Sequence, residues 1–216
     1  MRALIRPPRP PRALVALAPL LAACLSLGGQ KPEAVEIYAL DVAFEGPPAA
    51  GSAPPVAVAA PRAAPGFDGP RLVYVRRAHE LRHYARADWV EPPARMVGPL
   101  LVRALERTGR FQAVVAAPGG VAAGLRLDTE IVRLQQEFTE KPSRVRFTLR
   151  AQLADVAAGR VLGTRELEAV EPAPSDDAYG GVLAANRAVR RVLEEAAGWC
   201  AGLAGGAPAA GAAPPR

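Results

Sequence analysis

Apolar and charged residues alternate strictly in the second half of the chain. One row sets Leu125, Leu127, Thr129 and Ile131 against Arg126, Asp128 and Glu130, and the next sets Val145, Phe147, Leu149, Ala151 and Leu153 against Arg144, Arg146, Thr148, Arg150 and Gln152. A period of two predicts antiparallel strands that are covered on one face and solvated on the other. A turn at 155–159 leads to a third strand from Arg160 to about Val170, which completes a predicted meander.

The charged rows of this meander are complementary. Three arginines, Arg144, Arg146 and Arg150, are expected to face acids on neighbouring strands, which are Asp128, Glu130, Glu166 and Glu168. Cross-strand ion pairs on a solvated face explain these arginines without an anionic ligand.

Two stretches repeat their apolar residues at helical spacing. The stretch from Glu91 to Gly109 carries the stripe Met96, Val97, Leu100, Leu101, Ala104 and Leu105. Pro99 interrupts it and should kink the helix or delay its start. A second helix is predicted after Ser175-Asp-Asp177, whose side chains suit an N-cap. Its stripe is Tyr179, Val182, Leu183, Asn186, Val189, Leu193, Ala196 and Ala197.

Shorter strands are expected around these elements. Candidate segments are 36–42, 71–75 and 111–115, and a loop rich in Pro, Ala and Gly at 45–70 holds one strand-like stretch at 55–58. Two amphipathic helices and a sheet with one apolar face predict an α+β fold. We expect a two-layer domain in which an antiparallel or mixed β-sheet carries both helices on one face.

The N-terminus has the features of an export signal. Four arginines, at positions 2, 6, 9 and 12, precede an apolar run at 13–23, which is shorter than the roughly 20 residues that a membrane-spanning helix needs. The run ends in Leu21-Ala22-Ala23-Cys24, which resembles the lipobox of bacterial lipoproteins. We therefore predict cleavage between Ala23 and Cys24 and lipid attachment to Cys24, which would hold the protein on a membrane. A plain signal peptide with a chance cysteine is the alternative.

Removal of this segment changes the charge. The whole chain has a formal net charge of +6, but the mature part has 23 basic and 21 acidic residues. Such a balance argues against nucleic acid as a partner. Leu25 stands where an inner-membrane retention signal would place Asp, and by resemblance to lipoprotein sorting this favours the outer membrane, facing the periplasm.

Composition divides the mature chain into three parts. We predict a flexible tether at 24–34, a folded domain at 35–200 and a disordered Ala/Gly/Pro tail at 201–216. Cys200 is then the remaining thiol, and we expect it to pack beside Trp199 rather than to perform chemistry.

One stretch matches a zinc-peptidase signature. His79-Glu80-Leu-Arg-His83 is a literal H-E-x-x-H, which on a helix would put both imidazoles on one face. Arg82 places a charge inside the motif, no further histidine exists as a third ligand, and the residues from Leu81 to Trp89 alternate equally well as a strand. We therefore expect surface histidines and no bound metal, with a zinc metallopeptidase as the alternative.

Other catalytic signatures are missing from the sequence. It contains neither a G-x-S-x-G elbow nor a Walker A motif. Asn186 lies on the apolar side of the second helix, where bonding to backbone is the simplest explanation and a functional polar contact is the alternative.

Several short motifs follow one another in a characteristic order. After the lipobox they are Tyr38-Ala-Leu40, Leu72-Val-Tyr-Val-Arg76, His83-Tyr84, Trp89-Val-Glu-Pro-Pro93, Arg110-Phe-Gln-Ala-Val114, Ala185-Asn-Arg-Ala188 and Trp199. In this order and spacing the chain resembles the ABC-type transport auxiliary lipoprotein family, of the PqiC type, from about residue 20 to 200.

The resemblance implies a non-enzymatic accessory subunit without a cofactor. Its expected partners are an MCE-domain protein, an ABC permease–ATPase complex, or both, in lipid transport across the cell envelope, with a homo-oligomer left open. Tyr84 and Trp89 are candidate partner contacts, since aromatic residues recur at binding surfaces, and core packing is the alternative for Trp89. A purely structural lipoprotein of envelope assembly is a further alternative.

Overall fold

A computed structural model describes residues 34–46, 51–119 and 123–205 of the chain. The chain divides into two units, Met1–Ala34 and Val35–Arg216, and the described residues lie almost wholly in the second. The predicted cleavage and lipidation residues, Ala23 and Cys24, lie outside the described residues.

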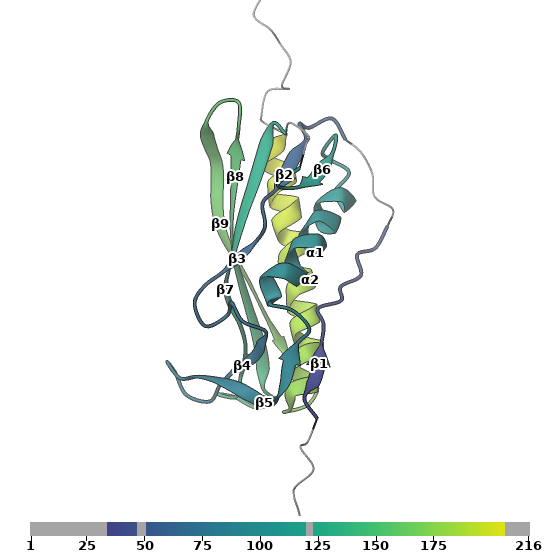
Figure 1. Ribbon diagram of the computed structural model, residues 1–216. Helices are drawn as coiled ribbons and strands as arrows, with labels where there is room; N and C mark the ends of the chain where they lie inside the picture. Colours follow the sequence, from purple (N-terminus) through teal and green to yellow (C-terminus); the bar gives the residue numbers. More distant parts are fainter. Residues whose placement is uncertain (1–33, 47–50, 120–122, 206–216) are drawn as a thin grey trace, which may run out of the picture. The chain divides into compact units, whose positions relative to one another are not determined.

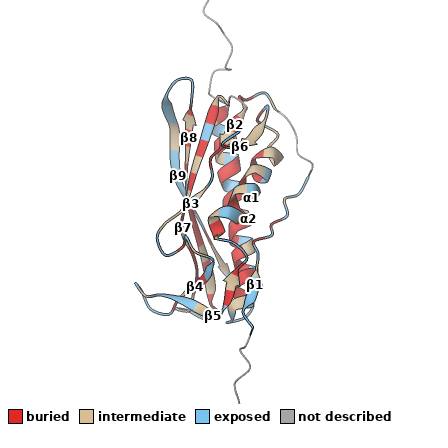
Figure 2. Ribbon diagram, in the orientation of Figure 1, coloured by how far each residue is buried: buried red, intermediate tan, exposed pale blue. Residues whose placement is uncertain are grey.

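The predicted meander is present and is longer than expected. It consists of β7 (Leu125–Glu137), β8 (Arg144–Asp155) and β9 (Arg160–Pro172), paired antiparallel in sequence order. Its apolar rows form the centre of the core, where Leu127, Phe147 and Leu149 are fully buried. In Figure 2 the ribbon of β7 is largely red and tan, whereas that of the outer strand β9 is largely pale blue and tan.

A bulge explains why β7 continues beyond its predicted end. The register of β7 against β8 shifts between Ile131 and Arg133, so Val132 is the extra residue. An extra residue reverses which side chains face the core. Inward positions are odd up to Ile131 and even from Leu134, a change that ends the visible alternation in the sequence.

Short strands complete the nine-stranded sheet on the other edge of β7. Three of them pair parallel with β7, namely β2 (Val56–Val58), β3 (Arg62–Ala63) and β4 (Arg71–Val75). β6 (Val114–Ala116) extends the sheet beyond β2, whereas β5 (Leu81–Trp89) and then β1 (Glu36–Tyr38) extend it beyond β4. The sheet is therefore mixed.

Both helices lie on the same side of the sheet (Figure 1), so the predicted α+β fold is confirmed. α1 (Pro93–Arg107) buries Val97, Leu101 and Leu105. Pro99 lies inside α1 and does not delay its start, which suits Pro93 in the opening turn. α2 (Ala178–Ala204) packs on β8, β9 and α1, and its N-cap is Asp177 as expected. The Asp177 carboxylate accepts a hydrogen bond of 2.7 Å from the Gly180 amide.

Several boundaries differ from those expected. β1 is three residues long and β6 begins three residues later than the strand predicted at 111–115. α2 runs to Ala204, so residues 201–204 are helical and the disorder expected from residue 201 is wrong for them. The reason is packing, because the side chain of Leu203 lies against Gly163 of β9 and Ala204 is buried.

Candidate functional site

The two aromatic residues predicted as partner contacts occupy different environments. Trp89 at the end of β5 has 5% of its surface exposed, so its side chain belongs to the core. Tyr84 in the same strand is half-buried, and its ring lies 4.8 Å from that of Tyr74. Burial raises the pKa of Tyr84 well above its ordinary value. Of the pair, Tyr84 is the more exposed and is the one that can contact a partner at the surface.

A buried amide connects Tyr84 to the start of α2. The side chain of Gln136 accepts a hydrogen bond of 2.8 Å from the Tyr84 hydroxyl and donates one of 2.9 Å to the Ser143 hydroxyl. A Cβ atom at Gly181 would lie 2.1 Å from the Gln136 carbonyl oxygen. Only glycine therefore lets the helix approach this amide, and we interpret the network as structural.

The H-E-x-x-H segment does not form the helix that the zinc hypothesis requires. His83 lies in β5, and His79 lies in the preceding turn with a φ of 66°. Hydrogen bonds from Arg77 and Arg82 lower the pKa of Glu80 to about 2, which disfavours a role as a general base. In the described part of the chain no three His, Cys, Asp or Glu side chains are placed to hold a metal ion.

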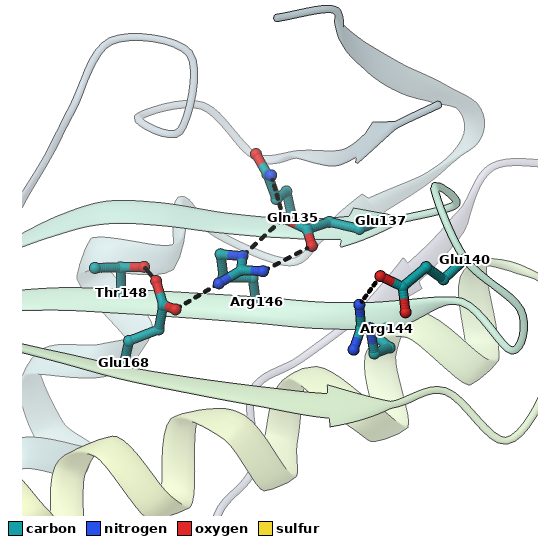
Figure 3. A network of polar contacts seen from close by, with 7 residues as sticks. All are labelled: Gln135, Glu137, Glu140, Arg144, Arg146, Thr148 and Glu168. Carbon is teal, nitrogen blue, oxygen red and sulfur yellow. Dashed lines mark hydrogen bonds and ion pairs between the residues drawn. The ribbon is translucent and has the colours of Figure 1, made fainter. Parts of the chain in front are cut away.

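The solvated face of the meander carries one of the expected cross-strand ion pairs, between Arg146 and Glu168 (Figure 3). Arg144 pairs instead with Glu140 in the turn after β7, and Arg150 forms no ion pair with the residues that the structure describes. The Arg146 guanidinium lies between Glu137 of β7, at 2.8 Å, and Glu168 of β9. Burial raises the pKa of Glu137, but hydrogen bonds from Arg146 and Gln135 outweigh it and hold this pKa below its ordinary value. The arginine interacts with protein carboxylates, which supports a stabilising role for it.

Two further residues have structural roles. The side chain of Asn186 accepts a hydrogen bond of 2.7 Å from the Asp41 amide and donates one of 3.0 Å to the Val182 carbonyl, so bonding to backbone is confirmed. Cys200 is a buried free thiol, and burial raises its pKa to about 12. A thiol in this state is a poor nucleophile.

An apolar groove lies beside α1. Its volume is about 520 Å³, and nearly all of its lining surface is carbon. The lining residues come from the end of β2 and the segment after it, from α1, and from the end of β6. They are Val58, Ala59, Ala60, Pro61, Ala94, Arg95, Gly98, Pro99, Val102, Arg103, Ala116 and Ala117. We refer to this feature as the α1 groove.

Sequence reasoning did not identify the α1 groove. Its lining combines three segments that are far apart in the chain, and most of its residues are small. The available signal was a stripe of small residues in α1, where Ala94, Gly98 and Val102 recur at helical spacing and are half-buried. A stripe of this kind does not by itself distinguish a groove from an ordinary half-buried helix face.

No helix within 34–46, 51–119 and 123–205 combines the length and apolarity needed to cross a bilayer. This finding concerns only those residues, and the predicted signal segment lies outside them.

Two solved structures show the same architecture. Protein XCC0632 from Xanthomonas campestris is 27% identical, with a TM-score of 0.69 over 77% of this chain and 95% of the other. An uncharacterized protein has a TM-score of 0.61 at 14% identity, over 78% of this chain and 97% of its own. The second likeness shows the fold alone.

The family comparison covers the folded domain. No curated protein matches the chain. A family model described as the ABC-type transport auxiliary lipoprotein component matches residues 38–197, from the end of β1 to near the end of α2. The chain therefore belongs to the ABC-type transport auxiliary lipoprotein family.

Proposed function

We propose that this protein is a non-enzymatic accessory subunit of an envelope lipid transport system. In this proposal it acts with an ABC permease–ATPase complex and an MCE-domain protein, and lipid on Cys24 anchors it to the outer membrane. The observation that carries the proposal is the family match over residues 38–197, since the family is an auxiliary component of ABC-type transport.

Two features of the chain support the finer parts of the proposal. The α1 groove is apolar and has the volume of a small-molecule site, about 300–1,000 Å³. Leu21-Ala-Ala-Cys24 has the pattern of a lipobox, and Leu25 follows the cysteine in place of the Asp of inner-membrane retention. The first feature favours a lipid cargo, and the second favours the outer membrane.

Co-purification tests the partner. Full-length protein with a C-terminal affinity tag is extracted from membranes with mild detergent, and the captured proteins are identified by mass spectrometry. We expect an MCE-domain protein together with a permease and its ATPase. Recovery of folded protein with none of these three would contradict the proposal.

Acyl labelling tests the anchor, and the chain supplies a matched control because it has two cysteines. In cells fed labelled palmitate, Cys24→Ser should abolish incorporation and release the protein from the membrane fraction. Cys200→Ala should leave both unchanged, since Cys200 is buried in α2. Membrane retention of Cys24→Ser at the wild-type level would show that another segment anchors the protein.

A further inference from the structure

The α1 groove is a hollow that the chain's own side chains leave open. Ala59 and Ala60 line one side, Ala94 and Gly98 of α1 line another, and the end of β6 closes it. A Cβ atom at Gly98 would lie 3.2 Å from Pro61, so the absence of a side chain there lets α1 approach this segment. The depth of the groove thus depends on small residues in elements that contact each other.

Two arginines contribute positive charge to the lining of the groove. Arg95 and Arg103 belong to this lining and are exposed, and they lie eight residues apart in α1. This spacing corresponds to about 12 Å along a helix. Neither guanidinium forms a hydrogen bond or an ion pair with other residues that the structure describes. The lining contains no Asp or Glu.

We propose that the α1 groove binds one acyl chain of an anionic phospholipid, with the headgroup phosphate beside Arg95 or Arg103. The apolar lining matches the chain and the uncompensated arginines match the phosphate, which guanidinium groups bind well. A neutral apolar ligand would offer no negatively charged group to the guanidinium groups of Arg95 and Arg103. The choice of a lipid over other anionic amphiphiles rests on the proposed function.

Photolabelling tests the site in the full-length lipoprotein. The protein is reconstituted into vesicles of phosphatidylethanolamine and phosphatidylglycerol that contain a phosphatidylglycerol with a diazirine on one acyl chain. After irradiation, labelled peptides are identified by mass spectrometry. We expect labels concentrated on peptides from α1 and from residues 58–61. Labels spread evenly over the domain would overturn the proposal.

Filling the groove should block the acyl chain. Val102→Trp places a large ring in the groove, and each buried methylene contributes about fourfold to binding, so loss of a few methylenes should reduce labelling at least about tenfold. Ala116→Trp fills the groove from the exposed end of β6 and serves if Val102→Trp unfolds. Val161→Trp, at a position of β9 that is 52% exposed and outside the groove, is the matched control and should label like wild type. Equal labelling of all variants would overturn the proposal.

Charge is tested separately. The double substitution Arg95→Gln and Arg103→Gln should reduce labelling by the phosphatidylglycerol probe about fivefold or more, and labelling by a phosphatidylcholine probe much less. An equal reduction with both probes would overturn the role of the arginines.

The two proposals can fail independently. Partner recovery without groove labelling would refute the lipid site and leave the proposed function standing. Groove labelling without recovery of an MCE or ABC protein would refute the proposed function and leave the site standing.

Discussion

The two edges of β7 are built in contrasting ways. On one edge, twelve residue pairs join β7 to β8 in a ladder interrupted by a single bulge. On the other, β2, β3 and β4 contribute three, two and two pairs, with chain leaving the sheet between them. The continuous edge belongs to the meander of β7, β8 and β9, which we call the scaffold. At the interrupted edge, the segment that links β2 to β3 lines the α1 groove. In this fold, the irregular half supplies the concave surface.

The contrast has a physical origin. Antiparallel neighbours need only a short turn, so the meander forms from local contacts. Parallel pairing requires the chain to cross back over the sheet, and here α1 lies between the β4–β5 pair and β6. Along this edge β2, β3 and β4 each pair with β7 for only two or three residues, and the segment that links β2 to β3 lines the α1 groove.

The largest expected effect is in the scaffold. Phe147 of β8 is fully buried, so Phe147→Ala removes a ring from the centre of the core and should lower the free energy of unfolding by about 3–5 kcal/mol. Urea unfolding measures this loss, and the slope of the free energy of unfolding against urea concentration should stay unchanged. Val161→Ala on β9, which is 52% exposed, should change stability by less than about 0.5 kcal/mol. Similar losses in the two variants would contradict the assignment of the core.

The next effect concerns the junction of β5, β7 and α2, where Tyr84, Gln136 and Gly181 meet. Gly181→Ala forces a Cβ against the Gln136 amide and should cost about 1–3 kcal/mol, because either the helix shifts or the amide loses its bonds to Tyr84 and Ser143.

Gly198→Ala is the matched control in the same helix. A Cβ there meets no atom within 4 Å, so this substitution should stabilise the protein by about 0.5–1 kcal/mol. Thermal unfolding of the two variants compares them directly. If Gly181→Ala also stabilised the protein, the close contact with Gln136 would be wrong.

The smallest effect is on the solvated face of the scaffold. The pKa of Glu137 is lower in the folded protein than its ordinary value of 4.5. The unfolded chain therefore binds more protons at low pH, and the contribution of this carboxylate is present above pH 4.5 and lost as the pH falls through its folded-state pKa. Arg146→Gln should cost about 1 kcal/mol near neutral pH and reduce this pH dependence.

Arg150→Gln is the control for that substitution, since Arg150 is an exposed arginine on the same strand. Arg150→Gln should change the free energy of unfolding between pH 3 and pH 7 less than Arg146→Gln does. An equal effect would mean that overall charge, rather than the contact with Glu137, sets the pH dependence.

The sequence by itself determined the parts of this protein that depend on local periodicity. Alternation placed Leu127, Phe147 and Leu149 in the core, helical spacing located α1 and α2, and Asp177 marked the start of α2. The order of short motifs also led to the family that the comparison shows. These predictions were correct because each feature depends on residues within a few helical turns or one strand of continuous chain.

Only the tertiary structure decided the rest. The bulge at Val132 reversed the alternation of β7, and Leu203 extended α2 because it packs on Gly163. Strand formation from Leu81 separated His79 from His83, Trp89 entered the core, and three distant segments of small residues formed the α1 groove. Each outcome depends on which residues meet across the fold. Periodicity along the chain contains no information about such contacts, since it reports only which face of its own element a residue occupies.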